Sequence, residues 1–516
     1  MNKIAKRLIA AAMTVLMLAA SVPVFASAAS GRCDCEHVPM IYVYGRQATY
    51  DDPNSPDRQE LNLLTDEKLS TLLKTVLPYA SKAILTNNYD EYCEVLVSEF
   101  IKAIGDFGLD ENGNLKNGSG IDYGWSAENP DTLIDSHKED NVYSYVFLYD
   151  ARLDPWEIAD DFKVFIQAVK DVTGHDTVNI ISRCMGSEYA LAYFAKYGWS
   201  DIETFVQNCS SANGTDVMSE LFAGKIKLDP DAIDRFMTED VEAEPFTKAL
   251  VSVLNQAKLL GAGTAVINRI YNKIRTRVVP EVMINEYATC PGYWTLVSSK
   301  DYEDAKKLIF SGREQTYAGL IEKIDNYNEK VRTKLPEILQ SMHSDGVKLC
   351  TIVKYGFQLQ PVTESYELQS DDKISVQAQG FMNGGTAPQG ETFSRRYIRQ
   401  AKKDGTYKYI SPDKVIDASK CLFPDTTWFM KDIRHNNFPG CVNRLYIAAC
   451  RSEKELTVND DERFPQYLRH YYWEDSLVPL NEENAKVFEY PSGFFKTFFT
   501  FVKLLIEKIK TSIKPA

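Results

Sequence analysis

A cysteine stands at a position where a strand should turn into a helix. Cys184 follows the apolar run of residues 177–181 (TVNII), with Ser182 two places before it and Gly186 and Ser187 two and three places after it. Small residues at these places let a helix pack closely against the preceding strand, and the tight turn between them exposes the side chain at its tip. An exposed thiolate is a strong nucleophile toward carbonyl carbon. The pattern therefore predicts a nucleophile elbow in which Cys184 is the nucleophile.

Alternating strands and helices are expected around this cysteine. Asp154-Pro155 should begin a helix that Gly174 ends. Apolar, β-branched and aromatic runs predict strands at residues 39–44, 143–149, 177–181, 202–206 and 347–355. Strands that alternate with helices form a mostly parallel sheet with helices on both faces. The predicted fold class is therefore α/β.

The alternation stops in the middle of the chain, where helical patterns replace it. We expect a large helical cap at residues 215–345, inserted between a first part of the α/β core at 29–214 and a second part at 346–475. The core carries the cysteine in its first part, so any partner residues that follow the cap must come from the second part.

The stretch from Tyr145 to Tyr197 resembles lipases and esterases of the α/β-hydrolase superfamily. It is most similar to the lecithin:cholesterol-acyltransferase-like and bacterial triacylglycerol lipase branches, in which a Tyr-Asp strand end and a helix precede G-H-S-M-G-G. This chain has Tyr149-Asp150 and then residues 182–187 (SRCMGS), so cysteine replaces serine and arginine replaces histidine. The resemblance implies an α/β-hydrolase fold and acyl transfer, which a cysteine can perform when a histidine promotes its ionisation.

The resemblance also implies a catalytic histidine late in the chain. Only six histidines are present. His435 ends a strand-like run, residues 428–435 (WFMKDIRH), where the histidine of the family belongs, and His470 is the alternative. In chain order the family places an acid between the nucleophile and the histidine.

The acid is expected in a loop that resembles the D-G-x-V segment of the lipases. Residues 411–419 (SPDKVIDAS) match it, with Asp413 at the position of the acid and Asp417 as the alternative in the same loop. Asp425 and Asp432 are less favoured.

The oxyanion hole needs two backbone N–H groups. By the same resemblance we expect them from Met185 and from Arg46, with Gly45 allowing the close turn. The histidine would take the thiol proton, the cysteine would attack an ester or thioester carbonyl, and water would release the acid, while the aspartate holds the imidazole. This chemistry requires no metal and no organic cofactor.

The composition and the N-terminus indicate where such a protein works. The 58 basic and 72 acidic residues give a net charge of −14, which argues against a nucleic-acid partner. A basic start, an apolar run at residues 8–20 and Ala26-Ser27-Ala28 predict a signal peptide at 1–28, with an uncleaved anchor as the alternative. We expect a secreted or cell-surface protein, in which some of the ten cysteines are free to form disulfides.

The C-terminal segment at residues 493–514 has the pattern of a basic amphipathic helix. Apolar residues fall on one helical face, and five lysines lie within residues 494–514. Such a helix either contacts a membrane surface or docks on the body of the protein.

Three functional hypotheses follow. The first is a secreted, lipase-like hydrolase that acts on a hydrophobic or acyl ester through a Cys-His-Asp triad. The second is an inactive hydrolase fold used for surface binding. The third is a cysteine acyltransferase or peptidase, which shares the same first step. Fold resemblance alone does not decide among them.

Overall fold

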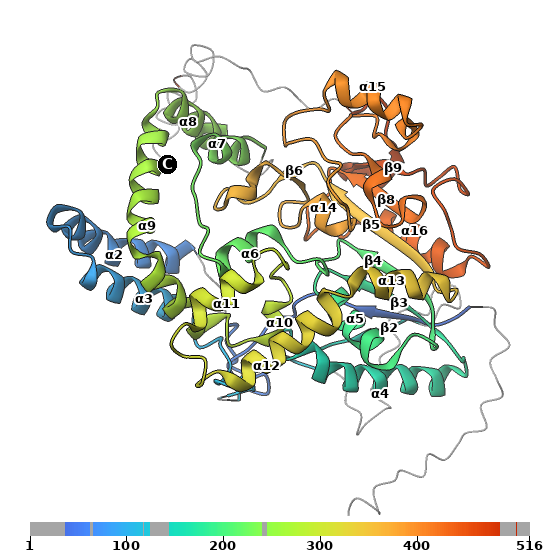
Figure 1. The fold of residues 1–516 in the computed structure, drawn as a ribbon, viewed down its shortest axis with the longest axis horizontal. Coiled ribbons are helices and arrows are strands. Elements are labelled where there is room, and N and C mark those ends of the chain that lie inside the picture. Colours follow the sequence, from blue (N-terminus) through green and yellow to red (C-terminus); the bar gives the residue numbers. More distant parts are fainter. Residues whose placement is uncertain are drawn as a thin grey trace, which may run out of the picture.

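The computed structural model describes residues 37–61, 66–116, 118–123, 144–239, 245–485 and 502. The predicted signal peptide at 1–28 and, apart from Val502, the predicted basic helix at 493–514 lie outside the described residues. Within these ranges the protein has an eight-stranded sheet with helices packed on it (Figure 1).

The sheet is parallel except for its last edge strand. Its order is β10-β9-β8-β5-β4-β3-β1-β2, and only β10 runs antiparallel to its neighbour. The strands are β1 (Met40–Val43), β2 (Ser144–Phe147), β3 (Val178–Arg183), β4 (Ile202–Asn208), β5 (Lys348–Tyr355), β8 (Thr427–Lys431), β9 (Tyr467–Tyr471) and β10 (Ser476–Pro479). All five strands expected from apolar runs are present, and the predicted α/β fold is confirmed.

Each face of the sheet is covered by its own hydrophobic cluster, because successive strand residues point to opposite faces. On one face, Phe162 of α4 (Pro155–Thr173) and Phe194 of α5 (Gly186–Tyr197) pack with side chains of β1, β3 and β4. On the other face, Leu445 and Tyr446 of α16 (Gly440–Arg451) pack on Trp428 and its neighbours. Both faces are therefore buried, as a parallel sheet requires.

Helix α4 has the ends that its sequence predicts. The Asp154 carboxylate accepts a hydrogen bond from the backbone N–H of Trp156 at 3.0 Å, and Pro155 occupies the first helical turn. Gly174 follows the helix in the left-handed conformation, with φ 71°. These capping interactions fix where α4 begins and ends after β2 has ended at Phe147.

A long helical insertion separates β4 from β5. It contains α6 (Asp216–Phe222), α7 (Pro230–Glu239), α8 (Pro245–Gln256), α9 (Leu259–Glu286), α10 (Pro291–Trp294), α11 (Tyr302–Phe310), α12 (Ala318–Tyr327), a π-helical turn η3 (Asn328–Arg332) and α13 (Leu335–Ser344). Two helices from before the sheet's second strand, α2 (Asp66–Thr86) and α3 (Asp90–Ile104), join it, since α3 packs along α9 (Figure 1). The cap is thus built from two separate stretches of sequence.

Length and composition rule out a membrane span by any single helix in the described ranges. The segments Thr247–Gln256 and Leu259–Glu286 pass the same test only together, and they are bent by 81° relative to each other.

Short elements fill the connection between β5 and β8. They are β6 (Phe357–Gln358), η4 (Glu364–Glu367), β7 (Gln369–Ser370), α14 (Val376–Gln379), α15 (Arg395–Lys403), η5 (Tyr407–Tyr409), η6 (Ala418–Lys420) and η7 (Pro424–Thr426), and η8 (Tyr472–Glu474) joins β9 to β10. Strands β6 and β7 pair with each other as a small antiparallel sheet.

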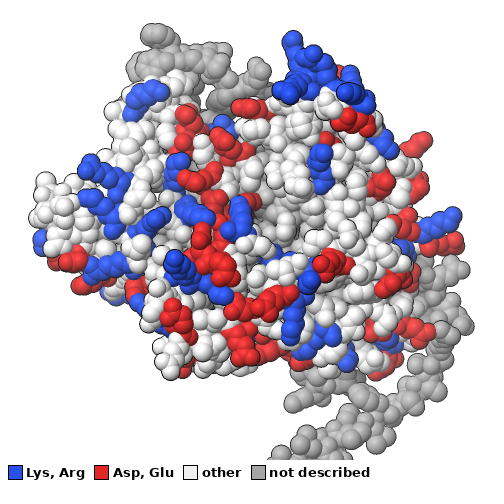
Figure 2. All heavy atoms as spheres, viewed as in Figure 1, with Lys and Arg blue, Asp and Glu red and all other residues white. Residues whose placement is uncertain are grey.

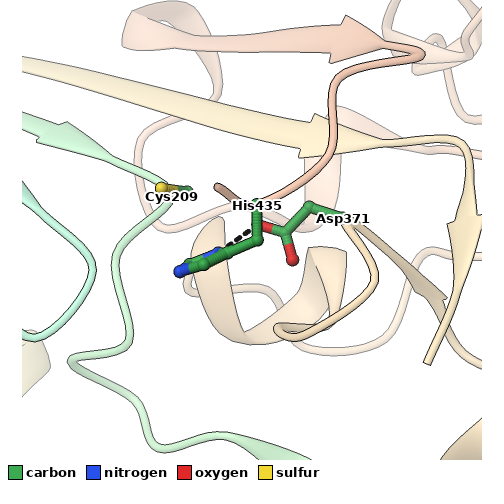
Figure 3. Close-up of side chains that lie close together, drawn as sticks. All are labelled: Cys209, Asp371 and His435. Atoms are coloured by element: carbon green, nitrogen blue, oxygen red, sulfur yellow. Dashed lines mark hydrogen bonds and ion pairs between the residues drawn. The ribbon is translucent and has the colours of Figure 1, made fainter. Parts of the chain in front are cut away.

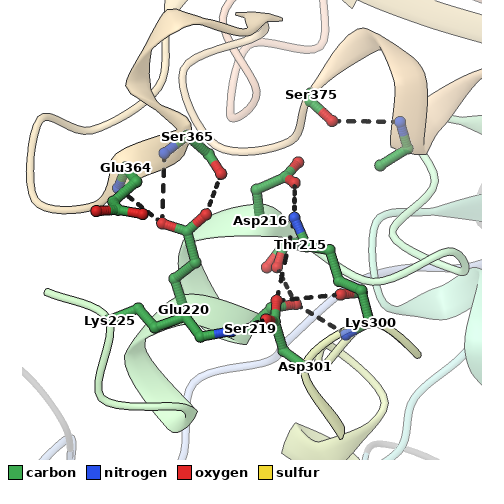
Figure 4. A network of polar contacts seen from close by, with 12 residues as sticks. Thr215, Asp216, Ser219, Glu220, Lys225, Lys300, Asp301, Glu364, Ser365 and Ser375 are labelled. Atoms are coloured by element: carbon green, nitrogen blue, oxygen red, sulfur yellow. Dashed lines mark hydrogen bonds and ion pairs between the residues drawn. The ribbon is translucent and has the colours of Figure 1, made fainter. Parts of the chain in front are cut away.

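A polar network joins the cap to this connection (Figure 4). The carboxylate of Glu220 on α6 accepts hydrogen bonds from the backbone N–H of Glu364 at 2.8 Å and of Ser365 at 3.3 Å, and also from the Ser365 hydroxyl. Helix α6 is tied in turn to the loop before α11 by the ion pair of Lys300 with Asp216 at 3.0 Å. Helix α6, the first helix of the cap, therefore fixes the position of η4, and β7 follows η4 in the chain.

Charges of both signs are mixed over the face that Figure 2 shows, with Asp and Glu gathered near its middle. The densest basic group lies over α15 (Figure 2), whose sequence RRYIRQAKK exposes three arginines and two lysines.

Candidate active site

Cys184 occupies a tight turn between β3 and α5. Its φ is 50°, in the left-handed region that side-chain-bearing residues rarely adopt. A Cβ atom on Gly186 would overlap the carbonyl oxygen of Val43, so only glycine lets α5 approach β1 this closely. The Ser182 and Ser187 hydroxyls are fully buried, lie 2.9 Å apart and fix the turn from below. The turn therefore holds Cys184, which is half-buried, at the carboxyl edge of the sheet.

His435 lies in the loop after β8 and is bound to an acid that the sequence did not single out. Its Nδ1 is 2.8 Å from Oδ2 of Asp371, and its backbone N–H donates to the carbonyl oxygen of Asp371 at 2.7 Å (Figure 3). Asp371 follows β7 directly and is completely buried. Its other carboxylate oxygen accepts the backbone N–H groups of Ile374 at 2.8 Å and Lys373 at 3.1 Å. These backbone hydrogen bonds fix the carboxylate independently of its contact with the imidazole.

The electrostatics of His435 favour its protonated form. Burial lowers the pKa of this imidazole, but the Asp371 carboxylate and the nearby Cys184 and Cys209 sulfurs outweigh burial and raise the pKa well above its usual value. The other ring nitrogen, Nε2, points away from Asp371 (Figure 3). A histidine held in this way attracts the proton of a nearby thiol to Nε2, which is the first step of general base catalysis.

The expected acids lie elsewhere, so the assignment of Asp413 or Asp417 to the histidine is corrected to Asp371. Asp413 forms a buried ion pair with Lys431 at 2.8 Å and accepts the hydroxyl hydrogen of Tyr355 at 3.0 Å. Asp417 accepts the Tyr397 hydroxyl at 2.7 Å and caps η6. The loop that carries Asp413 and Asp417 packs in a hydrophobic cluster with side chains of β5 and β8. The segment that reaches His435 is instead the one that follows β7.

The remaining alternatives are also bound elsewhere. Asp432 pairs with Arg469 at 2.8 Å, and Asp425 accepts the Tyr409 hydroxyl at 3.0 Å. His470 lies on β9 beside Cys441 and Asp475.

A second cysteine, Cys209, shares the histidine. Arg183 and Asn208 are the last residues of the adjacent parallel strands β3 and β4, and they are paired with each other. Cys184 and Cys209 follow them directly, so both cysteines leave the sheet side by side. The Cys209 sulfur, an Asp371 oxygen and a His435 ring nitrogen lie within 4.8 Å of one another (Figure 3). Burial raises the pKa of Cys209, but Lys354 and His435 outweigh it, and the net shift is downward.

Accessibility separates the two thiols. Cys209 is fully buried, whereas Cys184 is only half-buried, so a substrate can reach Cys184 alone. A thiol, an imidazole and a carboxylate are also zinc-ligand types. The bond between Nδ1 and Asp371, however, leaves Nε2 as the only free ring nitrogen of His435 for such an ion. One feature of the sequence could have indicated Cys209, because it follows the predicted strand that comes next in the chain after Cys184 and its helix.

A buried carboxyl group lies one helical turn beyond Cys184. Glu188 of α5 is fully buried and accepts the Ser211 hydroxyl at 2.6 Å, and the same hydroxyl is 3.9 Å from the Cys184 sulfur. Burial raises the pKa of Glu188 to about 7. Sequence reasoning missed this residue because it resembled an ordinary polar position of α5.

The two backbone groups expected in the oxyanion hole flank Cys184. Met185 is the next residue, and the loop after β1 passes close by, since a Cβ on Gly45 would be 3.1 Å from the Cys184 Cβ. Within the described ranges, neither the Met185 N–H nor the Arg46 N–H donates to another protein group. Both donors are therefore free for a ligand oxygen.

Comparison with known proteins adds little. No family model matches the chain, and no curated protein matches it. Among solved structures, it is similar to a chain in the crystal structure of the Tle4–Tli4 complex, at 14% identity and a TM-score of 0.18. That match covers 36% of this chain and 48% of the other, so this chain spans about half the length of the protein it matches. At this TM-score the likeness carries no argument, and the α/β fold rests on the sheet described above.

Proposed function

We propose that this protein is a hydrolase of esters or thioesters that works through Cys184, His435 and Asp371. One observation carries the proposal: a half-buried cysteine at a left-handed turn between a strand and a helix lies within electrostatic range of a buried histidine–aspartate pair. A nucleophile, a base near it and an acid that orients the base form the general arrangement of covalent acyl transfer.

The chemistry proceeds in two halves. His435 Nε2 accepts the thiol proton of Cys184 while the sulfur bonds to the carbonyl carbon. The carbonyl electron pair moves to oxygen and then returns, which expels the alcohol or thiol with the proton from His435. Water next attacks the enzyme thioester, gives a proton to His435 and releases the carboxylic acid, after which Cys184 regains its proton.

The two free N–H groups, of Met185 and Arg46, would bind the oxyanion in both halves. Donors that are already aimed at the developing charge need no reorganisation during the reaction. Asp371 stabilises the imidazolium that forms in each half, and its buried position strengthens that interaction.

We favour a hydrophobic acyl substrate because the cap exposes apolar side chains. Five large hydrophobic residues are exposed on α2, and three more on α9. They are Leu69, Leu73, Leu77, Ile84 and Leu85 on α2, and Leu259, Val266 and Ile267 on α9. Exposed apolar side chains on both helices are what a surface that meets lipids or other apolar partners would require. Export by residues 1–28 and membrane contact by residues 494–514 belong to the same proposal.

The test is intact-mass analysis after exposure to activated esters of short and long acyl chains. We expect one acyl adduct on wild-type protein, mapped by peptide analysis to Cys184. Cys184→Ala should abolish the adduct, and the matched variant Cys209→Ala should retain it. An adduct on Cys209 instead would overturn the assignment of Cys184, and no adduct with any ester on correctly folded protein would overturn the proposal in favour of a hydrolase fold used for binding.

A further inference from the structure

A second cluster of metal-ligating side chains lies at the edge of the sheet that the proposed mechanism does not use. Cys441 is in the first turn of α16, His470 is on β9, and Asp475 is in the turn that leads into β10. Their sulfur, nitrogen and carboxylate oxygen lie within 4.8 Å of one another. Three different elements therefore bring three different donor atoms to one point.

The histidine of this cluster forms no hydrogen bond of good geometry. Only 2% of the His470 side chain is exposed, and among the described residues Asp475 and the backbone of Asp432 face its ring without pairing closely with Nδ1 or Nε2. Its Nε2 is 3.6 Å from a carboxylate oxygen of Asp475, which is too far for a good hydrogen bond but places the nitrogen toward the cluster. Buried ring nitrogens are normally well paired, and a ligand between His470 and Asp475 would complete the pairing of this one.

The backbone around the cluster is arranged for close approach. A Cβ on Gly440 would lie 3.1 Å from the other carboxylate oxygen of Asp475, so glycine at that place lets the turn come near the helix. Asp475 itself has a φ of 41°, in the left-handed region. Cys441 lies in the first turn of the 12-residue helix α16, and burial together with the Asp475 carboxylate raises the pKa of its thiol to about 12, so the thiol keeps its proton until an ion displaces it.

We propose that Cys441, His470 and Asp475 bind a divalent transition-metal ion, and that Zn²⁺ fits best. Zinc takes sulfur at about 2.3 Å and nitrogen or oxygen at about 2.0–2.2 Å in a tetrahedron, and a mixed sulfur, nitrogen and oxygen donor set is one it prefers over Mg²⁺ or Ca²⁺. On binding, Cys441 releases its proton to solvent, and His470 supplies its Nε2 lone pair. The side chain of Asp475 is 54% exposed, so water can reach the fourth position.

The ion would join the start of α16 to the β9–β10 turn. Strand β10 has only β9 as a neighbour in the sheet, so a metal clip would stabilise an edge that few contacts hold. Helix α16 begins in the segment that follows His435, and the ion would stabilise this region without taking part in catalysis.

The experiment is a Co²⁺ titration of chelator-treated full-length protein, followed by absorption spectroscopy. Tetrahedral Co²⁺ with a thiolate ligand gives visible d–d bands and a near-ultraviolet charge-transfer band. We expect one equivalent to bind with both signals, Zn²⁺ to displace it, and Zn²⁺ to raise Tm. Cys441→Ser should remove the charge-transfer band, and Asp475→Asn, at an exposed position, should weaken binding by about tenfold or more.

Two controls make the outcome decisive. Cys450→Ser changes another buried cysteine of α16 outside the cluster and should bind Co²⁺ like the wild type. Cys209→Ser tests whether Co²⁺ binds instead beside His435. A charge-transfer band that persists in Cys441→Ser, or one that only Cys209→Ser removes, would overturn the site. An absence of thiolate-bound Co²⁺ in the wild type would do the same.

Discussion

Asp371 holds His435 at two points: its side chain contacts the imidazole Nδ1, and its carbonyl oxygen accepts the His435 backbone N–H at 2.7 Å. The acid therefore fixes both the ring and the loop that carries it. If the side-chain contact serves catalysis, it should be separable from the backbone contact by mutation.

Asp371→Asn should lower kcat by about 10³–10⁴-fold, because the amide no longer stabilises the imidazolium and can select the wrong tautomer. The backbone hydrogen bond is kept, so circular dichroism should change little, whereas Tm should fall because a buried charged pair is lost. The measurement is steady-state hydrolysis of an activated ester.

Asp413→Asn is the matched control for that variant, because Asp413 is the acid that the sequence pattern favours. Its loss leaves Lys431 buried without its partner, so we expect a stability loss of about 3–5 kcal/mol with kcat of the folded fraction retained. Equal loss of kcat in both variants would contradict the assignment of Asp371.

Gly186→Ala should destabilise the protein by about 1–3 kcal/mol, since the added methyl group overlaps the Val43 carbonyl oxygen and pushes α5 away from β1. Gly263→Ala is the control, because that helical glycine has nothing within 4 Å of an added Cβ. It should be neutral or stabilising by about 0.5–1 kcal/mol. Urea unfolding of both variants tests this, and similar midpoints would refute the close-packing argument.

Cys184→Gly and Cys184→Ala should both abolish acyl transfer but differ in stability. Alanine keeps the strain of a side chain at a φ of 50°, whereas glycine adopts this conformation freely. We expect the glycine variant to be more stable than the alanine variant by about 1 kcal/mol. Chemical denaturation measures the difference. A less stable glycine variant would mean that the turn is not strained.

Glu188 should make stability fall as the pH rises from about 4.5 to about 7. Its folded-state pKa is raised by burial to about 7, from 4.5, so across this window the unfolded chain loses the proton while the folded protein keeps it. The folded state then binds more protons than the unfolded state, and the stability lost is roughly 3 kcal/mol, complete near pH 7. Glu188→Gln removes this dependence.

The pH test compares the unfolding free energies of wild type and Glu188→Gln from pH 4.5 to pH 8. The difference between them should move in favour of the variant up to about pH 7 and then stay constant. A difference that does not vary with pH would show that Glu188 does not titrate in this range.

Much of the sheet is predictable from local sequence, because buried parallel strands are short apolar runs with clear ends. The run at residues 202–206 becomes β4 (Ile202–Asn208), and Asp154 and Gly174 cap α4 as their types predict. These features depend on neighbours along the chain. Local propensity and capping therefore suffice to place them.

The acid could not be found in this way. Asp371 follows β7, which has only two residues and no periodic pattern, whereas the loop of Asp413 offered a motif. What decides between them is which loop the tertiary structure brings to His435. Cys209 was missed for a related reason, since its closeness to the elbow follows from the register of β3 and β4. The residues next to either cysteine do not specify how β3 and β4 align with each other.

The hydrogen bonds that the Glu220 carboxylate accepts from Ser365 have an evolutionary consequence. The cap helix α6 holds the turn that leads into β7, and Asp371 is the first residue after that strand. Grafting a foreign cap onto this core to change substrate preference would therefore disturb the acid as well. Cap and acid should be inherited, and engineered, as one module.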